Sequence, residues 1–380
     1  MNTLLPDAID LNLLRRALVI KLRHHGDVLL TSPVFTVLKN HAPHLEIDAL
    51  VYQDTQEMLT LHPAMQNVFT IDRDWKRKGL GQQIKHELNL LKRLRERHYD
   101  LIVHLTEHPR GAWLTRWLAP RYSVAGEYSH RRGALWRSSF SHICRQPATP
   151  RHIVEQHLDA LRRLGIYPGP DERCVVFVPG HDAEVFIDSL LEQHGLGQKQ
   201  FIHLHPTSRW SFKTWRDDYY ADLINALHEA GEQVVITAAP DEKEMAAVRR
   251  ITERLIRPAI DFSGQLTLKQ LAALTARAKC FVGVDSVPMH IAAAMQTPIV
   301  ALFGPSSEYV WGPWVAPGIL PPATLVYPYT SQVKHRVITS EHSCRPCGLD
   351  GCGGGKVSEC LTTLPVQRVF EVITQLIKTA

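Results

Sequence analysis

Polar residues that can bind phosphate or move protons follow several short apolar runs of this 380-residue chain. Asp285-Ser286-Val287-Pro288-Met289-His290 follows the apolar run Cys280 to Val284 and precedes three consecutive alanines. Asp and Ser are N-cap residue types, and a helix N-terminus carries free N–H groups and the positive end of the helix dipole. The pattern predicts an anion site for a phosphorylated ligand at Asp285 to His290. A helix cap without a ligand explains the same residues equally well.

A second cluster follows the apolar run Phe201 to His205. It contains Thr207, Ser208 and, five residues later, Lys213. Two hydroxyl donors and one ammonium on a loop at the end of a strand are suited to hold a diphosphate. The alternative is a polar surface loop whose neighbouring tryptophans only pack against apolar residues.

Acidic residues follow the ends of two further predicted strands. Asp241 and Glu242 follow Gln233 to Thr237, where an acid can bind ribose hydroxyls in doubly wound folds, although helix capping is as good an explanation. Asp27 follows Ala17 to Leu22 and could act as a general base. Taken by itself, Asp27 is better explained as an N-cap residue.

Four of the seven cysteines are close together near the C-terminus, at Cys344, Cys347, Cys352 and Cys360. Four thiols at short spacing can bind zinc, but this spacing is not the paired C-x2-C of ribbons or fingers. A reduced, packed knuckle without metal is the favoured interpretation. An odd number of cysteines fits a reducing compartment better than a disulfide scaffold.

Apolar runs and helical patterns alternate along the whole chain, which predicts an α/β protein with parallel sheets covered on both faces. The Gly195-Leu196-Gly197 stretch interrupts the alternation and is interpreted as a connector. Two doubly wound domains of similar size are therefore predicted, at residues 1–196 and 197–380, with a final amphipathic helix over Pro365 to Lys378. No G-x-G-x-x-G follows the first strand and no P-loop motif occurs, which argues against a standard dehydrogenase and a P-loop enzyme.

Charge is unevenly distributed. The segment from Lys76 to Arg151 holds 16 lysines and arginines against 5 acids, whereas the whole chain has a net charge of only +5. Such a segment predicts an acidic partner such as a phosphorylated lipid or a membrane surface, unless it is only a solvated helix face. Nucleic acid is the weakest candidate, because no recognised fold signature or stacking motif is present. No apolar run is long enough to span a bilayer, and no signal peptide is expected.

Taken together, these motifs resemble the bacterial lipopolysaccharide heptosyltransferases of glycosyltransferase family 9. The similar features are the Gly26-Asp27 turn, the Thr207-Ser208 loop with Lys213-x-Trp215, the Val284-Asp285-Ser286-x-x-x-His290 block and the turn Phe303-Gly304-Pro305. The resemblance is greatest to members that add a branching inner-core heptose. It implies a GT-B fold, in which two Rossmann-like domains face one another across a cleft and a C-terminal helix crosses back to the first domain.

The resemblance also implies ADP-L-glycero-D-manno-heptose as donor substrate, with no further cofactor required, and the heptosylated Kdo–lipid A core as acceptor. By motif, Asp27 is the general base, Lys213 binds the donor phosphates beside Thr207 and Ser208, and Asp241 or Glu242 holds the adenosine ribose. Asp285 reaches the donor heptose, and the turn from Ser286 to Met289 receives the diphosphate. The family usually has Gly after the Asp-Ser pair, whereas this chain has Val287-Pro288, and Pro288 offers no N–H.

The basic segment is expected to bind the phosphorylated acceptor, and the acceptor-binding residues predicted are Lys76, Arg77, Lys78, Arg110, Arg131 and Arg132. A cytoplasmic enzyme bound peripherally to the anionic inner membrane follows from that expectation. Two other functions remain open: a nucleotide-sugar-binding protein without chemistry, and a UDP-sugar epimerase of similar two-domain architecture.

Overall fold

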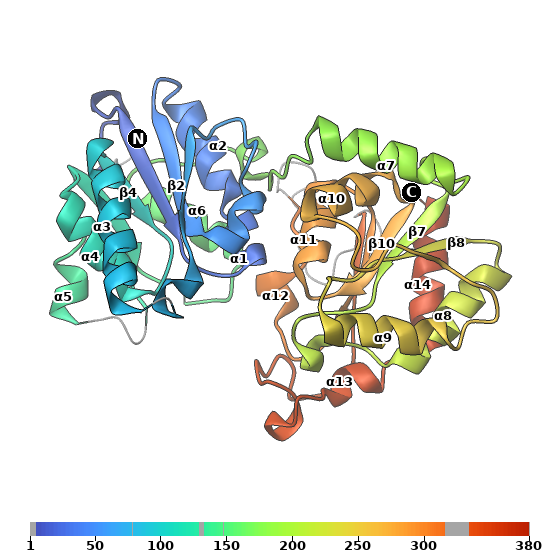
Figure 1. Ribbon diagram of the computed structural model, residues 1–380. Coiled ribbons are helices and arrows are strands. Elements are labelled where there is room, and N and C mark those ends of the chain that lie inside the picture. Colours follow the sequence, from blue (N-terminus) through green and yellow to red (C-terminus); the bar gives the residue numbers. More distant parts are fainter. Residues whose placement is uncertain (1–4, 78, 129–132, 147, 316–333, 380) are drawn as a thin grey trace. The chain divides into compact units, whose positions relative to one another are not determined.

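The computed structural model describes residues 5–77, 79–128, 133–146, 148–315 and 334–379 (Figure 1). The chain divides into two compact units, unit 1 at Met1–Val178 and unit 2 at Pro179–Ala380. Each unit contains one six-stranded sheet in which all paired strands run parallel. The predicted α/β class with two doubly wound parallel sheets is confirmed. No helix in the described ranges is both long and apolar enough to cross a membrane.

Unit 1 has the strand order β3-β2-β1-β4-β5-β6. Its strands are β1 (Arg16–Lys21), β2 (Glu46–Tyr52), β3 (Asn67–Ile71), β4 (Leu101–His104), β5 (Tyr122–Gly126) and β6 (His142–Cys144). Its α-helices are α1 (His25–Leu29), α2 (Ser32–His41), α3 (Leu80–Glu96), α4 (Pro109–Leu118), α5 (Ala134–Arg137) and α6 (Ile153–Arg163). Short 3₁₀ helices are η1 (Leu11–Leu13), η2 (Gln53–Met58), η3 (Arg73–Arg77) and η4 (Asp171–Arg173).

Unit 2 has the strand order β12-β11-β10-β7-β8-β9. Its strands are β7 (Phe201–His205), β8 (Gln233–Ile236), β9 (Ile260–Asp261), β10 (Cys280–Val284), β11 (Ile299–Phe303) and β12 (His335–Thr339). Its longer helices are α7 (His181–Gln193), α8 (Asp217–Glu229), α9 (Glu242–Thr252), α10 (Leu268–Arg277), α11 (Val287–Ala294) and α14 (Val366–Thr379). Shorter helices are η5 (Ser211–Lys213), α12 (Glu308–Trp311), η8 (Cys352–Gly354) and α13 (Glu359–Thr362).

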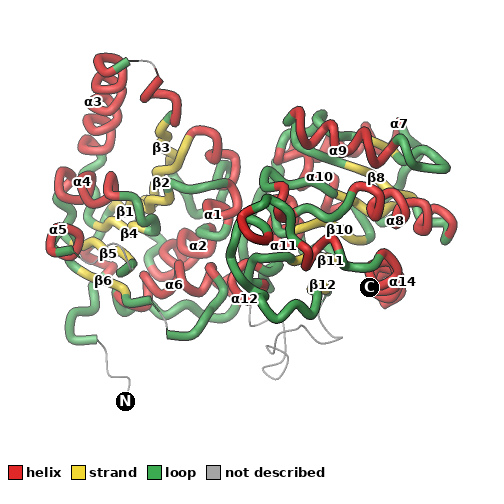
Figure 2. Tube along the Cα trace, turned by 90° about the horizontal axis from the view of Figure 1, so that it is seen from below, coloured by secondary structure: helices red, strands yellow, loops and turns green. Residues whose placement is uncertain are grey.

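Apolar residues cover both faces of the unit 2 sheet, because successive side chains of a strand point to opposite faces. Val282 and Val284 of β10 pack in one core with α8, α9 and α14. Phe281 packs on the other face against α11, while Phe201 of β7 packs there with α7 and α10. Figure 2 shows helices flanking the strands in each unit. A parallel sheet covered on both faces exposes only the loops at its strand ends. The predicted donor-binding residues and Asp27 lie in the segments that follow the carboxyl ends of strands.

One detail of the predicted domain organisation differs from the structure. Helix α7 belongs to unit 2, where Ile187 and Leu191 are buried with residues of β7 and α10, so the boundary lies at Val178 rather than at residue 196. Helix α14 belongs to unit 2, where Val369, Ile373 and Leu376 pack into one core with α8. That it crosses back to the first domain stays a prediction.

Candidate active site

An ion pair marks the carboxyl edge of the unit 2 sheet. Strands β7 and β10 are parallel neighbours, with Gly283 opposite His205, so the segments that follow them emerge at the same edge. Lys213 ends η5 after β7, and Asp285 follows β10 directly. The Lys213 Nζ atom lies 2.5 Å from Oδ2 of Asp285, whose side chain is only 6% exposed. The structure therefore brings together the two residues that the sequence predicted for donor phosphate and donor sugar.

Helix α11 begins beside this pair. Ser286 is its N-cap residue with extended backbone, and the Ser286 hydroxyl donates to Val284 O at 3.4 Å rather than capping the helix. Met289 was predicted to offer its N–H group to the diphosphate. That N–H already donates to Ser286 O at 3.2 Å, because the first turn closes there. Both Met289 and His290 are buried, at 0% and 4% exposure.

The loop after β7 contacts a carboxylate that sequence reasoning missed. Thr207 is buried, and its Oγ1 donates a 2.6 Å hydrogen bond to Glu244 Oε2 on α9. Asp241 caps α9 by accepting from the backbone N–H groups of Lys243 and Glu244. Asp241 and Glu242 are exposed, whereas Glu244 is only 8% exposed. The helix-capping interpretation of Asp241 is thus confirmed, and Glu244 is the acid of this segment that faces the predicted donor loop.

Ser208, the second predicted hydroxyl of the loop, is half-buried. Its Oγ accepts a hydrogen bond from the Trp210 N–H at 3.3 Å, which is a local turn contact. Below the loop, His203 and His205 of β7 both contact Thr237 Oγ1, at 2.7 and 2.8 Å. Burial lowers the pKa of His205 to about 3, so its ring is neutral. These buried polar contacts fix the end of β7 from which the loop departs.

Asp27 lies within α1 of unit 1, three residues after the N-cap residue His24. The N-cap interpretation of Asp27 is therefore wrong. Its carboxylate is 14% exposed, and its Oδ1 lies 3.8 Å from both Lys21 Nζ and Arg23 Nε. Lys21 is 5% exposed, and the Arg23 side chain is about half exposed. The structure thus places a nearly buried carboxylate between two cations at the carboxyl end of β1.

The residues predicted to bind the acceptor have varied surroundings. Arg77 is exposed and pairs with Asp74 at 3.3 Å. Arg110 is the second residue of α4 and pairs with Glu87 of α3, so its guanidinium already has a carboxylate partner within unit 1. Lys78, Arg131, Arg132 and the side chain of Lys76 lie outside the described residues.

The segment that contains the four clustered cysteines contacts the turn after β11. Arg345, next to Cys344, donates to Gly304 O at 2.7 Å, and Gly348, next to Cys347, donates its N–H to Pro305 O. Cys360 is buried against Gly304, and Cys352 Sγ accepts from the Glu359 N–H at 3.4 Å. The described residues include no group of three or more His, Cys, Asp or Glu arranged to hold a metal ion. A knuckle without metal stays a prediction.

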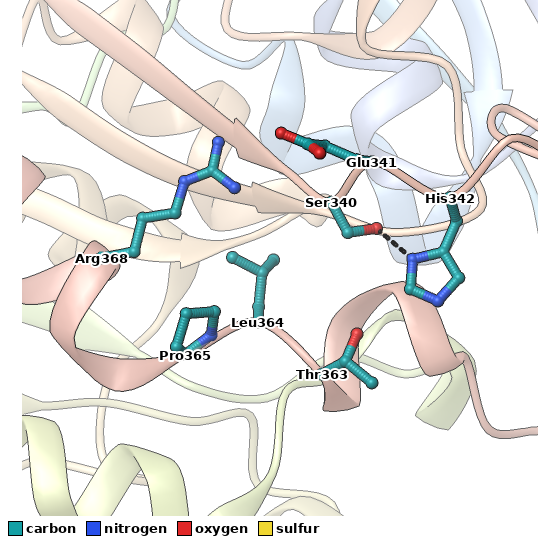
Figure 3. A pocket seen from close by; sticks show the side chains of 7 residues that line it. All are labelled: Ser340, Glu341, His342, Thr363, Leu364, Pro365 and Arg368. Atoms are coloured by element: carbon teal, nitrogen blue, oxygen red, sulfur yellow. Dashed lines mark hydrogen bonds between the residues drawn. The ribbon is translucent and has the colours of Figure 1, made fainter.

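A separate open pocket of about 480 Å³ lies beyond the end of β12 (Figure 3). The pocket is lined by Ser340, Glu341, His342, Thr363, Leu364, Pro365 and Arg368, and the His342 ring contacts Ser340 Oγ at 2.9 Å. None of the predicted donor-binding residues lines it. The predicted donor residues instead follow the carboxyl ends of β7 and β10, apart from Asp241 and Glu242, which follow β8.

Comparison with known proteins agrees with the motifs. The family described as glycosyltransferase family 9 (heptosyltransferase) matches residues 88–319. Lipopolysaccharide heptosyltransferase 3 of Escherichia coli is 36% identical over 294 residues, covering 77% of this chain and 84% of that protein. A solved family 9 glycosyltransferase from Veillonella parvula has a TM-score of 0.78 at 20% identity, covering 98% of this chain and 99% of the other. The E. coli ADP-heptose LPS heptosyltransferase II has a TM-score of 0.72 at 21% identity, covering 96% and 99%. The chain therefore belongs to glycosyltransferase family 9, the heptosyltransferases.

Proposed function

We propose that this enzyme transfers L-glycero-D-manno-heptose from ADP-heptose to a heptose of the lipopolysaccharide inner core, with inversion at the anomeric carbon. The proposal that the enzyme binds ADP-heptose rests on the Lys213–Asp285 ion pair beside the N-terminus of α11. One similar protein of known structure is named for ADP-heptose and lipopolysaccharide, and the 36% identical relative is a lipopolysaccharide heptosyltransferase. The GT-B fold that the motifs imply is part of this proposal.

In the proposed reaction, Asp27 accepts the proton of an acceptor heptose hydroxyl. The acceptor oxygen forms a bond to the anomeric carbon while the bond from that carbon to the ADP oxygen breaks, so ADP leaves with the bonding electrons. A single displacement inverts the configuration. Negative charge grows on the departing diphosphate, and Lys213 with the positive end of α11 offers fixed charge at that point. Ser286 and Val287 begin the turn that receives the phosphates, and Glu244 takes the place first given to Asp241 or Glu242 beside the ribose.

The assignment of the acceptor rests on the positive charge of one segment of unit 1. We infer that the acceptor is a phosphorylated lipid A core, because the segment from Lys76 to Arg151 is strongly basic. Arg77, which is exposed, is the described member of the predicted set most available to an anionic ligand. Peripheral contact with an anionic membrane on its cytoplasmic face follows from an acceptor of this kind.

The experiment that tests the catalytic assignment is Asp27→Asn. We expect loss of heptosyl transfer by about a thousandfold, while the dissociation constant for ADP stays within about twofold, because the donor residues lie in unit 2. Turnover is measured with ADP-heptose and a deacylated core acceptor, and ADP binding by calorimetry. Asp188→Asn, which removes a surface carboxylate paired with Arg277, serves as the control and should keep normal turnover. Near-normal transfer by Asp27→Asn would exclude Asp27 as the base.

Nucleotide choice tests the donor separately. The melting temperature should rise with ADP but not with equal concentrations of UDP or NAD. A nucleotide raises the melting temperature only if it binds the folded chain, and we expect the donor site to bind ADP alone. A response to UDP alone would instead favour the epimerase alternative.

A further inference from the structure

Lys21 is the last residue of β1, and its side chain is buried in unit 1. Its Nζ atom donates to Leu105 O at 3.0 Å and contacts His157 Nε2 at 2.9 Å. The third neighbour is Asp27, whose Oδ1 lies 3.8 Å away. An ammonium has three donors and no acceptor: two of them are used by Leu105 O and His157 Nε2, and the charge forms an ion pair with Asp27.

The same contacts determine the state of His157. Lys21 can only donate, so His157 Nε2 must accept, and the ring proton then resides on Nδ1. Nδ1 contacts Leu30 O at 3.0 Å, where that proton is donated. Burial also lowers the pKa of His157 well below 6.5. The ring is therefore a neutral and rigid acceptor that holds Lys21 from the side of α6.

Several ionisable groups lie around the Lys21 ammonium: Asp27, Arg23, Glu107, His104 and His157. Burial lowers the pKa of Lys21 to about 8, while the Asp27 charge opposes that shift. Burial lowers the pKa of His104 to about 3. At neutral pH, the two histidines are therefore uncharged and Lys21 keeps its proton.

We propose that Lys21 is a positioning residue for Asp27, holding its carboxylate at a fixed place for proton transfer; this inference rests on the proposed function. Lys21 and Arg23 both approach the same carboxylate oxygen, Oδ1, which leaves Oδ2 for an acceptor hydroxyl. Arg23 is about half exposed, so water screens its pair, whereas Lys21 is held by two buried neutral acceptors. A charge that is already oriented costs no reorganisation during the reaction.

The first test is Lys21→Met, which keeps the length of the side chain but removes the charge. We expect kcat to fall by about tenfold or more, with KM for donor and acceptor within about twofold, because the contact is made to the base rather than to either substrate. Lys39→Met is the matched control: Lys39 of α2 also donates to a backbone carbonyl, Leu45 O at 3.0 Å, whereas the cations paired with Asp27 within the described ranges are Lys21 and Arg23. Normal kcat in folded Lys21→Met would overturn the proposal.

A second variant separates charge from folding. Lys21→Gln keeps an N–H donor for the buried acceptors, so it should fold even where Lys21→Met does not, and its kcat should fall similarly. Wild-type kcat in Lys21→Gln would also overturn the proposal. In an Asp27→Asn background, Lys21→Met should cause no further loss of the residual rate, since Lys21 acts through Asp27. A further loss would show that it acts elsewhere. If Asp27→Asn itself keeps transfer, the proposed function fails, whatever the Lys21 variants do.

Discussion

Lys213 is held by Asp285, and an incoming diphosphate would meet the same ammonium. Replacing Lys213 with alanine removes that cation and leaves the nearly buried Asp285 carboxylate without its partner. We expect the affinity for ADP to fall by about tenfold or more, and the melting temperature to fall as well. Calorimetric titration with ADP and thermal unfolding measure the two effects.

Lys279 offers the matched comparison. Its Nζ lies 2.5 Å from Glu232 Oε2, so it forms an equally short ion pair, but it directly precedes β10 at the opposite end of that strand from Asp285. Lys279→Ala should leave the affinity for ADP unchanged. Equal losses of affinity in the two variants would mean that Lys213 is not part of the donor site.

Residue spacing predicted which strand ends are followed by polar residues, but not which of those side chains face the candidate site. Asp241, Glu242 and Glu244 occupy one short stretch, and each residue of a helix is turned by about 100° from the previous one. The inward acid therefore depends on where α9 begins. Because Asp241 is the N-cap residue, Glu244 falls at the third helical position and reaches Thr207. Spacing likewise predicts a ligand contact for the Met289 N–H, which the first turn of α11 already uses for Ser286 O.

At the scale of elements, the cysteine-rich segment braces the loop that carries Lys213. Ser358 is buried, and its Oγ donates to Phe212 O at 2.6 Å, while Ser211 Oγ donates to Lys356 O at 3.3 Å. Both contacts join the segment after Cys352 to η5. The position of Lys213 thus depends on residues that lie about 145 positions later in the chain.

Ser358→Ala tests this bracing. The change removes the donor to the Phe212 carbonyl, at a cost of about 1–3 kcal/mol in the free energy of unfolding. We also expect a loss of ADP affinity smaller than that of Lys213→Ala, because Lys213 is retained but less well held. Thr363→Val is the control, since the Thr363 hydroxyl is exposed and donates only to Glu359 O of its own helix. Unchanged ADP affinity in Ser358→Ala would argue against the bracing role.

Local pattern predicted several elements, including β7, whose bounds match the run from Phe201 to His205. It did not predict which sheet receives α7. An amphipathic sequence shows that a helix has an apolar face, but the partner of that face is decided by packing between distant segments. The edge strand β12 was also missed, because only two of its five residues are buried and its apolar pattern is weak.

At the scale of the whole molecule, neutral histidines are buried in both cores. Burial lowers the pKa of His62 to about 4 and of His104 to about 3 in unit 1. In unit 2 it lowers the pKa of His205 and His335 to about 3. In the unfolded chain these rings ionise near pH 6.5, so the unfolded state binds more protons below that pH.

Stability should therefore be full above about pH 6.5 and be lost as the pH falls toward 4, by about 1.4 kcal/mol per pH unit for each such histidine. His104 allows a specific test, because neither of its ring nitrogens has a hydrogen-bond partner among the described residues. Between pH 6 and 5, His104→Leu should reduce the slope of the unfolding free energy against pH by the contribution of one histidine, at most about 1.4 kcal/mol per pH unit. Urea unfolding at each pH measures that slope. His181→Leu, at an exposed position at the start of α7, should keep the wild-type slope. An identical slope in His104→Leu and wild type would show that His104 does not contribute to acid sensitivity, and that its charged form is tolerated in the folded core.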